Sequence, residues 1–330
     1  MKSSRFFLIL LPVIFSACNA DYYGEPRASV NDNSISVITT IFPPYDFVRT
    51  IAGISGGSET QDELTNIRLR MLLKPGAEIH SWEPSPQDII AIQNCDVFIY
   101  VGGESDVWVN RVLESIDKTG KKIITLLDCV EAVEEEIVEG MDTVEETKLQ
   151  VPGESSYDEH VWTSPRNAKL IAERIAASLC EADPANAAVY QSNIAAFLAE
   201  LDDLDAGFKS IVNNGIRRVF VFADRFPFRY FADAYGLQYF AAFPGCSAES
   251  EASAATIAFL INKVRAEKIP VVLYIEFSNS RMADTICGET GAGKELFHSA
   301  HNVSRDEFAG GVSYLEIMRR NAEVLRKALW

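Results

Sequence analysis

The four histidines of this chain lie where side chains from distant parts of a sequence can meet around one ligand. His80 follows a loop after an apolar run, and His160 precedes a short apolar piece and a helix start. His298 and His301 directly follow a later apolar run. Neutral imidazole suits Zn²⁺ and other late divalent metals. Taken together, the four histidines predict a metal site rather than four separate hydrogen-bonded imidazoles.

Carboxylates complete such metal sites. We rank the candidate carboxylates by their position in the sequence. Asp224 ends a run rich in Val and Phe and is the first candidate ligand. Glu276, Glu249 and Glu159 are weaker candidates. Glu159 can instead orient His160 from behind as a hydrogen-bond acceptor.

Strand-like and helix-like segments alternate along the chain, which predicts α/β architecture with parallel sheets. Ligand sites of such sheets form at the carboxyl ends of the strands. His80 and His160 would then belong to one lobe, and His298 and His301 to a second. The expected strands are at 34–41, 67–73, 97–101, 122–127, 219–222, 239–243, 271–275 and 295–297.

The order of elements occurs twice, which favours two similar lobes. Residues 41–53 (IFPPYDFVRTIAG) resemble residues 225–236 (RFPFRYFADAYG), and residues 75–89 resemble residues 244–257 in their Pro-Gly start and their spacing. Chance similarity between ordinary strand–loop–helix units is the alternative.

One long helix is predicted between the two repeats. Asp183 and Pro184 are typical of an N-cap followed by proline at the first helical position, and Gly215 is typical of a stop. About thirty helical residues rise roughly 45 Å, which suits a strut between lobes. We therefore expect an N-terminal lobe at 35–182, a linking helix at 183–214 and a C-terminal lobe at 215–330. The apolar stripe of this helix comprises Ile194, Phe197, Leu198, Leu201, Leu204, Phe208 and Ile211.

The net charge argues against one class of partner. It is −17, and it becomes −19 without residues 1–17, because Lys2 and Arg5 are the charged residues of that stretch. Nucleic-acid binding needs a concentrated basic face, so we expect none. An acidic surface attracts cations.

The first residues predict export. Lys2 and Arg5 precede an apolar core at 6–15 that is too short to span a bilayer. Residues 15–18 (FSAC) resemble the lipobox of bacterial lipoproteins, which implies a signal peptide at 1–17, lipid on Cys18 and an extracytoplasmic protein anchored to the cell membrane. Residues 18–34 suit a tether. An ordinary secretory signal is the alternative.

The acidic residues 131–159 and the remaining cysteines each allow a general and a more specific interpretation. Residues 131–159 are crowded with Asp and Glu around a single Lys148; they indicate a solvated surface loop or, alternatively, a cation-collecting arm. The remaining cysteines form no CxxC pair and indicate buried free thiols, with one disulfide as the alternative. They are Cys95, Cys129, Cys180, Cys246 and Cys287.

Two motifs resemble those of a known family. Residues 75–88 (PGAEIHSWEPSPQD) and 158–168 (DEHVWTSPRNA) are similar to the metal motifs of ZnuA/TroA-like substrate-binding proteins of zinc and manganese ABC importers. The resemblance extends from about Ile35 to Trp330. It implies two lobes joined by a rigid helix, His80 and His160 as metal ligands, binding without turnover, and a membrane permease as partner.

The second half departs from the family pattern. Residues 222–231 (FADRFPFRYF) hold no histidine where relatives carry a His or Glu ligand, so Asp224 is the expected substitute. The last ligand of the family, an Asp, falls on His298, with His301 close behind. The family's histidine-rich loop is replaced by the acidic residues 131–159.

The sequence therefore predicts a monomeric, non-enzymatic lipoprotein that captures a divalent metal and delivers it to an importer. Zn²⁺ is favoured over Mn²⁺ because the ligand set is rich in nitrogen. Affinity should fall below about pH 6.5, where protons compete for imidazole. One alternative is a zinc hydrolase, although the sequence has no HExxH or GxSxG motif. The other is a surface adhesin, or a binder of a metal chelate that uses Arg225 and Arg229.

Overall fold

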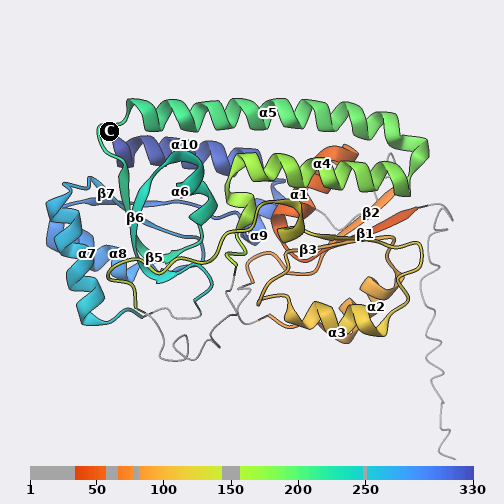
Figure 1. Ribbon diagram of the computed structural model, residues 1–330, viewed down its shortest axis with the longest axis horizontal. Coiled ribbons are helices and arrows are strands. Elements are labelled where there is room, and N and C mark those ends of the chain that lie inside the picture. The colour runs from red at the N-terminus through yellow and green to blue at the C-terminus, as the bar shows by residue number, and fades with distance from the viewer. Residues whose placement is uncertain (1–33, 57–65, 78–81, 143–156, 248–250) are drawn as a thin grey trace, which may run out of the picture. The chain divides into compact units, whose positions relative to one another are not determined.

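Two four-stranded parallel sheets carry the fold of this computed structural model, which describes residues 34–56, 66–77, 82–142, 157–247 and 251–330 (Figure 1). Cys18, His80, Glu249 and residues 143–156 of the acidic segment lie outside the described residues.

The first sheet has the strand order β2-β1-β3-β4, with every pair parallel. Val37 at its centre is aligned with Leu69 on one side and Val97 on the other. Strands flanked by helices on both faces are rich in β-branched residues, as here. The elements are β1 (Ile35–Thr39), α1 (Phe42–Ala52), β2 (Ile67–Met71), α2 (Pro86–Asn94), β3 (Val97–Tyr100), α3 (Val107–Ser115), β4 (Lys122–Thr125) and α4 (Pro165–Ala182).

The second sheet repeats this topology, with the order β6-β5-β7-β8 and parallel pairs throughout. All eight strands expected from the sequence are present, and the α/β class with two parallel-sheet lobes is confirmed. The elements are β5 (Val219–Phe226), α6 (Arg229–Tyr235), β6 (Gln238–Pro244), α7 (Ala254–Ala266), β7 (Val271–Tyr274), α8 (Arg281–Thr290), β8 (Gly293–Leu296), α9 (Arg305–Ala309) and α10 (Tyr314–Leu329).

The long helix α5 (Ala187–Asn214) runs along both lobes and packs on α4 and α1 along one half of its length and on α10 along the other half (Figure 1). Asp183 and Pro184 start a 3-10 turn rather than α5 itself, which begins after Asn186, and the Asp183 side chain makes no capping hydrogen bond. A 3-10 turn, Pro184–Asn186, precedes the helix, and the Asp183 carboxylate accepts hydrogen bonds from the Tyr190 hydroxyl (2.8 Å) and Asn186 Nδ2 (2.7 Å). Tyr190 is buried, and the Asp183 carboxylate is the acceptor that its hydroxyl needs.

One hydrophobic core runs through both halves by way of α5. Phe47 of the first half contacts Phe197 of α5, and Phe208 of α5 contacts Phe231 of the second half. Residues 35–330 accordingly form one compact unit. The lobe boundaries at 182/183 and 214/215 stay predictions.

Residues 130–142 belong to a surface loop, in which Glu131, Glu134, Glu136 and Glu139 are exposed, but they are also attached to the second lobe. Residues 130–142 cross from the end of β4 to β6 and α7 (Figure 1). Asp142 N–H donates to Ala242 O (2.9 Å) of the sheet's edge strand, and Asp142 also accepts from Ser253 Oγ (2.9 Å). We call residues 130–142 the strap; four of its acidic side chains bind groups of the second lobe, namely Glu135, Glu136, Glu139 and Asp142.

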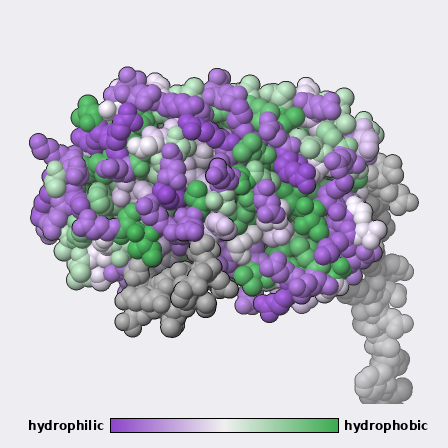
Figure 2. Space-filling view, in the orientation of Figure 1, coloured by the Kyte–Doolittle hydropathy of each residue, from purple (hydrophilic) through white to green (hydrophobic). Residues whose placement is uncertain are grey.

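The face of the molecule shown in Figure 2 is mainly hydrophilic. Hydrophilic residues cover most of the face in Figure 2, with apolar residues in separate groups. Within the described residues, no helix combines the length and the apolar character that crossing a membrane requires. The five described cysteines are free thiols, as predicted, although only Cys95 is fully buried.

Candidate metal centre

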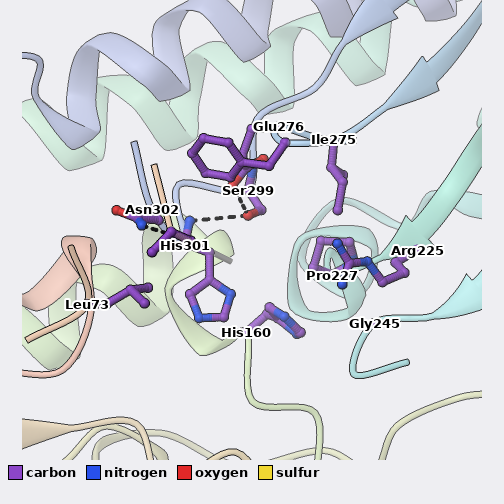
Figure 3. A pocket seen from close by; sticks show the side chains of 12 residues that line it. Leu73, His160, Arg225, Pro227, Gly245, Ile275, Glu276, Ser299, His301 and Asn302 are labelled. Atoms are coloured by element: carbon purple, nitrogen blue, oxygen red, sulfur yellow. Dashed lines mark hydrogen bonds between the residues drawn. The ribbon is translucent and has the colours of Figure 1, made fainter. Parts of the chain in front are cut away.

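Loops from both lobes enclose a cavity of about 30 Å³ at the carboxyl ends of the strands (Figure 3). The first lobe contributes the loop after β2 and the residues before α4. The second contributes the loops after β5, β6, β7 and β8. The lining residues are Leu73, Ala77, His160, Arg225, Pro227, Gly245, Ile275, Glu276, Phe277, Ser299, His301 and Asn302.

His160 lies at the start of a short 3-10 turn, Val161–Thr163, which leads into α4. The Asp158 carboxylate accepts a hydrogen bond from His160 N–H (2.8 Å) and contacts Nδ1 (3.1 Å). Burial opposes the charged imidazole, but the carboxylates of Asp158, Glu159 and Glu135 together outweigh it, Asp158 most, and leave the pKa of His160 raised. Asp158 thereby orients the ring and leaves Nε2 for a ligand, as carboxylates do behind metal-binding histidines.

A residue of the opposite lobe fixes Asp158 in turn. The Tyr230 hydroxyl, on α6, donates to Asp158 O (2.8 Å) and accepts from Val133 N–H (3.2 Å) of the strap. Gly245 closes the same side: a Cβ there would lie 3.2 Å from His160 Cε1 and 2.9 Å from Phe226 O. The position of His160 therefore depends on contacts from the second lobe.

His301 lies in the loop between β8 and α9, where Ala300 has a φ of +61°. Its N–H donates to Ser299 Oγ (3.2 Å), and Ser299 donates from N–H (2.8 Å) and Oγ to the Glu276 carboxylate. Glu276 therefore holds the loop that carries His301.

The two imidazoles lie next to each other at the cavity, with their rings nearly perpendicular (Figure 3). The centroids of the His160 and His301 rings are 5.6 Å apart, and Trp162 packs edge-on against both rings. Trp162 Nε1–H donates to Ser299 O (2.8 Å), which ties the two histidine-bearing loops together. Two of the four predicted histidines are thus brought together.

His298 is placed differently. Its Nδ1 accepts from Ala300 N–H (2.9 Å) and lies 3.5 Å from Glu276 Oε1. Asn321 binds both its N–H (2.8 Å) and its carbonyl oxygen (2.7 Å). His298 is not among the residues that line the cavity, and its ring supports the loop instead.

Asp224, the first candidate carboxylate, is likewise not among the residues that line the cavity. Its carboxylate accepts from Arg225 N–H (2.9 Å) and Ile275 N–H (3.3 Å), and burial raises its pKa. The pairing of β5 with β6 shifts register between Phe222 and Arg225, and Arg225 is the residue that lines the cavity. Of the candidate carboxylates, Glu276 is the described one that reaches the lining.

Glu159 does not have the orienting role considered for it. Its carboxylate accepts from Ser105 N–H (2.8 Å) in the first lobe, and burial raises its pKa. Asp158, two residues before His160, orients the imidazole. Asp158 was not among the residues predicted from the sequence, although its position in the motif at 158–168 is a usable signal.

Asn302 is a second residue that the sequence did not single out. Its Nδ2 donates to Lys74 O (2.9 Å) and to Ala77 O (2.9 Å), while Gly76 N–H donates to Val303 O (2.8 Å). The residues that lead toward His80 are thereby attached to the loop that carries His301. No sequence signal identifies this asparagine.

Within the described ranges, no three His, Cys, Asp or Glu side chains lie close enough together to hold a metal ion. The described part of the site is a pair of imidazoles with supporting carboxylates, one behind each histidine-bearing loop.

Two parallel-sheet lobes, a bridging helix and imidazoles at the inter-lobe cavity define the class of two-lobed metal receptors. The family model described as "Zinc-uptake complex component A periplasmic" matches residues 37–328. The chain belongs to this family, whose members are extracytoplasmic metal-binding components that work with an ABC importer.

Individual proteins of known name or structure are similar to this chain as well. The high-affinity zinc uptake system protein ZnuA of Bacillus subtilis (strain 168) is 27% identical, over 99% of this chain and 98% of that protein. The Zn(II)-bound ZnuA-like domain of Streptococcus pneumoniae AdcA is similar in structure, with a TM-score of 0.70, 25% identity, and 90% and 99% of the two chains covered. A mutant of the laminin-binding adhesin Lmb of Streptococcus agalactiae has a TM-score of 0.71 at 25% identity, with 90% and 100% covered.

Proposed function

We propose that this chain captures a divalent transition metal, zinc in preference to manganese, with His160 and His301 as ligands. The observation that carries the proposal is the 5.6 Å separation of the two ring centroids. A Zn–N bond is roughly 2.0–2.1 Å, so two imidazoles on one tetrahedral zinc ion have centroids about 5 Å apart. Only a small adjustment separates the described pair from that geometry.

His80 is the third nitrogen ligand in this proposal. Its motif supports the assignment, and so does the attachment of Lys74 and Ala77 to Asn302. Ala77 lines the cavity, and three residues of chain span at most about 11 Å. An imidazole at position 80 is therefore within reach of the ion.

The donor set favours zinc. Imidazole nitrogen is a borderline ligand that suits zinc, whereas manganese prefers oxygen donors. Glu276 is the described carboxylate at the cavity, and its oxygens already accept bonds from Ser299. A site with mainly nitrogen donors therefore binds zinc more tightly than manganese.

The cavity size supports binding without catalysis. A volume of about 30 Å³ admits an ion and a small ligand, but no peptide and no organic chelator. This disfavours the hydrolase and the chelate binder. Arg229, the second cation considered for a chelate, pairs with Asp233 and Glu136 and does not line the cavity.

The remaining features of the proposal concern delivery. The protein acts as a monomer, anchored through lipid on Cys18 and tethered by residues 18–34. It gives up the metal when it docks on the permease of its importer. The core shared through α5 resists a wide hinge opening, so capture and release involve small movements of the cavity loops.

Zinc titration of the metal-free chain tests the proposal. We expect one zinc ion per chain, bound more tightly than manganese, and a large loss of affinity in His160→Ala, His301→Ala and His80→Ala. Calorimetry that found all three variants binding zinc like the parent would refute the site.

A further inference from the structure

Three successive residues after β7 line the cavity, and one of them lies at its boundary with solvent. They are Ile275, Glu276 and Phe277, and we call residues 275–278 the β7 loop. Phe277 is 43% exposed, whereas Ile275 is 6% exposed. Every other described residue that lines the cavity is buried or partly buried. Phe277 therefore lies at the mouth of the cavity.

The backbone at Phe277 has an uncommon conformation. In an extended chain, successive side chains point to opposite sides, so three successive residues cannot all line one cavity. Phe277 has a φ of +60°, in the left-handed region, and this turn brings its side chain to the same cavity as that of Glu276. A bulky residue rarely adopts this conformation, which persists only where the surrounding structure holds it.

Asp224 holds the β7 loop on both sides of Phe277. Its carboxylate accepts hydrogen bonds from Ile275 N–H (3.3 Å), before Phe277, and from the Ser278 side chain, after it. Asp224 is itself buried, and it also accepts from Arg225 N–H (2.9 Å). The carboxylate expected from the sequence as a metal ligand thus fixes the loop that places Phe277 at the mouth.

The ring of Phe277, in contrast to its backbone, is not packed into a core. Within the residues that the structure describes, Phe277 belongs to none of the three hydrophobic clusters. The ring can therefore swing aside without loss of core packing. Exposed side chains change rotamer in picoseconds to nanoseconds, so such a ring opens and closes many times while one metal ion enters or leaves.

We propose that Phe277 is the gate of the metal cavity: its ring blocks the mouth most of the time, and metal passes when the ring swings aside. This inference rests on the proposed function, because it takes zinc binding at His160 and His301 as given. A ring that blocks the mouth equally in the free and the loaded protein slows entry and release by the same factor. Affinity is the ratio of the two rate constants and stays the same. The gate thus sets the rate of metal exchange and not the choice of metal.

The release rate of zinc from Phe277→Ala tests the gate. The zinc-loaded full chain is mixed rapidly with a chromophoric chelator, at chelator concentrations where the observed rate no longer depends on the chelator. The same chelator gives the equilibrium affinity by competition. We expect release about tenfold faster than in the parent, which corresponds to a mouth that is open about a tenth of the time. Zinc affinity should stay within about threefold of the parent, a difference below 1 kcal/mol.

Two further variants are the controls. Phe277→Leu keeps a bulky apolar side chain at the mouth, and its release rate should stay within about threefold of the parent. Leu296→Ala removes an apolar side chain of β8 that is 36% exposed and does not line the cavity, and it should release zinc at the parent's rate.

The outcomes separate the gate from the proposed function. Release at the parent's rate in Phe277→Ala would overturn the gate and leave the proposed function intact. Faster release with an equal loss of affinity would also overturn the gate, because Phe277 would then stabilise the loaded state. A parent that binds no zinc would overturn the proposed function and the gate with it.

Discussion

The Tyr230 hydroxyl donates a hydrogen bond to the carbonyl oxygen of Asp158, 2.8 Å away on the other lobe. Asp158 in turn binds the backbone N–H and Nδ1 of His160. One hydroxyl of the second lobe thus fixes the residue that orients a proposed ligand of the first.

Removal of that hydroxyl should therefore weaken metal binding. In Tyr230→Phe we expect zinc affinity to fall about tenfold, because support behind a metal-binding histidine contributes about 10- to 100-fold. Stability should fall by about 1 kcal/mol for the lost hydrogen bond. Zinc titration and urea unfolding measure the two effects.

Tyr235→Phe is a matched control on the same helix. Its hydroxyl donates to Asp205 (3.0 Å) of α5, away from the cavity. We expect a similar loss of stability with zinc affinity unchanged. Equal losses of affinity in both variants would mean that Tyr230 acts through general stability alone.

The pH dependence of zinc binding should reflect the Asp158–His160 pair. Metal needs the neutral imidazole, so affinity is full above the raised pKa of His160 and falls as pH drops through it. The loss should therefore begin above the ordinary histidine value of about 6.5. In the metal-free protein the sign is reversed: the charged pair stabilises the fold at low pH, and this contribution is lost as pH rises through the raised pKa.

Burial lowers this pKa, and Asp158→Asn removes the carboxylate that raises it most, leaving the weaker effects of Glu159 and Glu135. We expect the midpoint of the affinity–pH curve to move to lower pH, measured by zinc titration across pH. Asp205→Asn, at a carboxylate on α5, is the control and should leave the midpoint in place. An unchanged midpoint in Asp158→Asn would contradict the assignment of this titration to His160.

The two histidines after β8 should differ sharply. His301→Asn removes a cavity imidazole, and we expect at least about a 100-fold loss of zinc affinity. His298→Asn should stay within about threefold of the parent, because His298 does not line the cavity and an amide oxygen can replace Nδ1 as acceptor for Ala300 N–H. Zinc titration of both variants decides between them; the reverse ranking would make His298 the ligand.

His298 and His301 show how much of the site could be predicted from the sequence. Hydrophobic periodicity and helix-start residues predicted the eight strands, the long helix and the repeated topology, because these depend on local patterns. Which of His298 and His301 faces the cavity depends on the loop between them, where Ala300 has a positive φ. Alternating patterns do not encode such a turn.

Which of Asp224 and Arg225 reaches the cavity could not be predicted from the sequence either. They are neighbours, so their side chains diverge, and a register shift in β5 decides which one reaches the cavity. The contacts of the acidic strap were not predicted for another reason. Its carboxylates bind groups far away in the sequence, such as Cys246 N–H at Glu135 and the Tyr239 hydroxyl at Glu136. Charge alone does not reveal such partners.

The strap should tolerate no side chain at Gly140. Its φ is +88°, and a Cβ would lie 2.1 Å from Phe259 Cδ1. We expect Gly140→Ala to lower the free energy of unfolding by about 1–3 kcal/mol, from backbone strain and from displacement of Phe259. Urea unfolding measures this. Gly120→Ala, also at positive φ (+75°) but in open space, is the control and should lose less. Equal losses would mean that the contact with Phe259 contributes nothing.

Asn302 should control the first-lobe side of the metal centre. Asn302→Ala removes both bonds from its amide to Lys74 O and Ala77 O, and so loosens the chain that leads to His80. We expect zinc affinity to fall about tenfold, in the range for residues that support ligands. Asn193→Ala removes one amide hydrogen bond to Ile51 O (3.0 Å), away from the cavity, and should lower stability without lowering zinc affinity.

A double variant that combines Asn302→Ala with His80→Ala gives a sharper test. If Asn302 acts by positioning His80, the double variant should bind zinc no more weakly than His80→Ala alone, since residues that act through one ligand are not additive. Fully additive losses would mean that Asn302 supports the site through His301 instead.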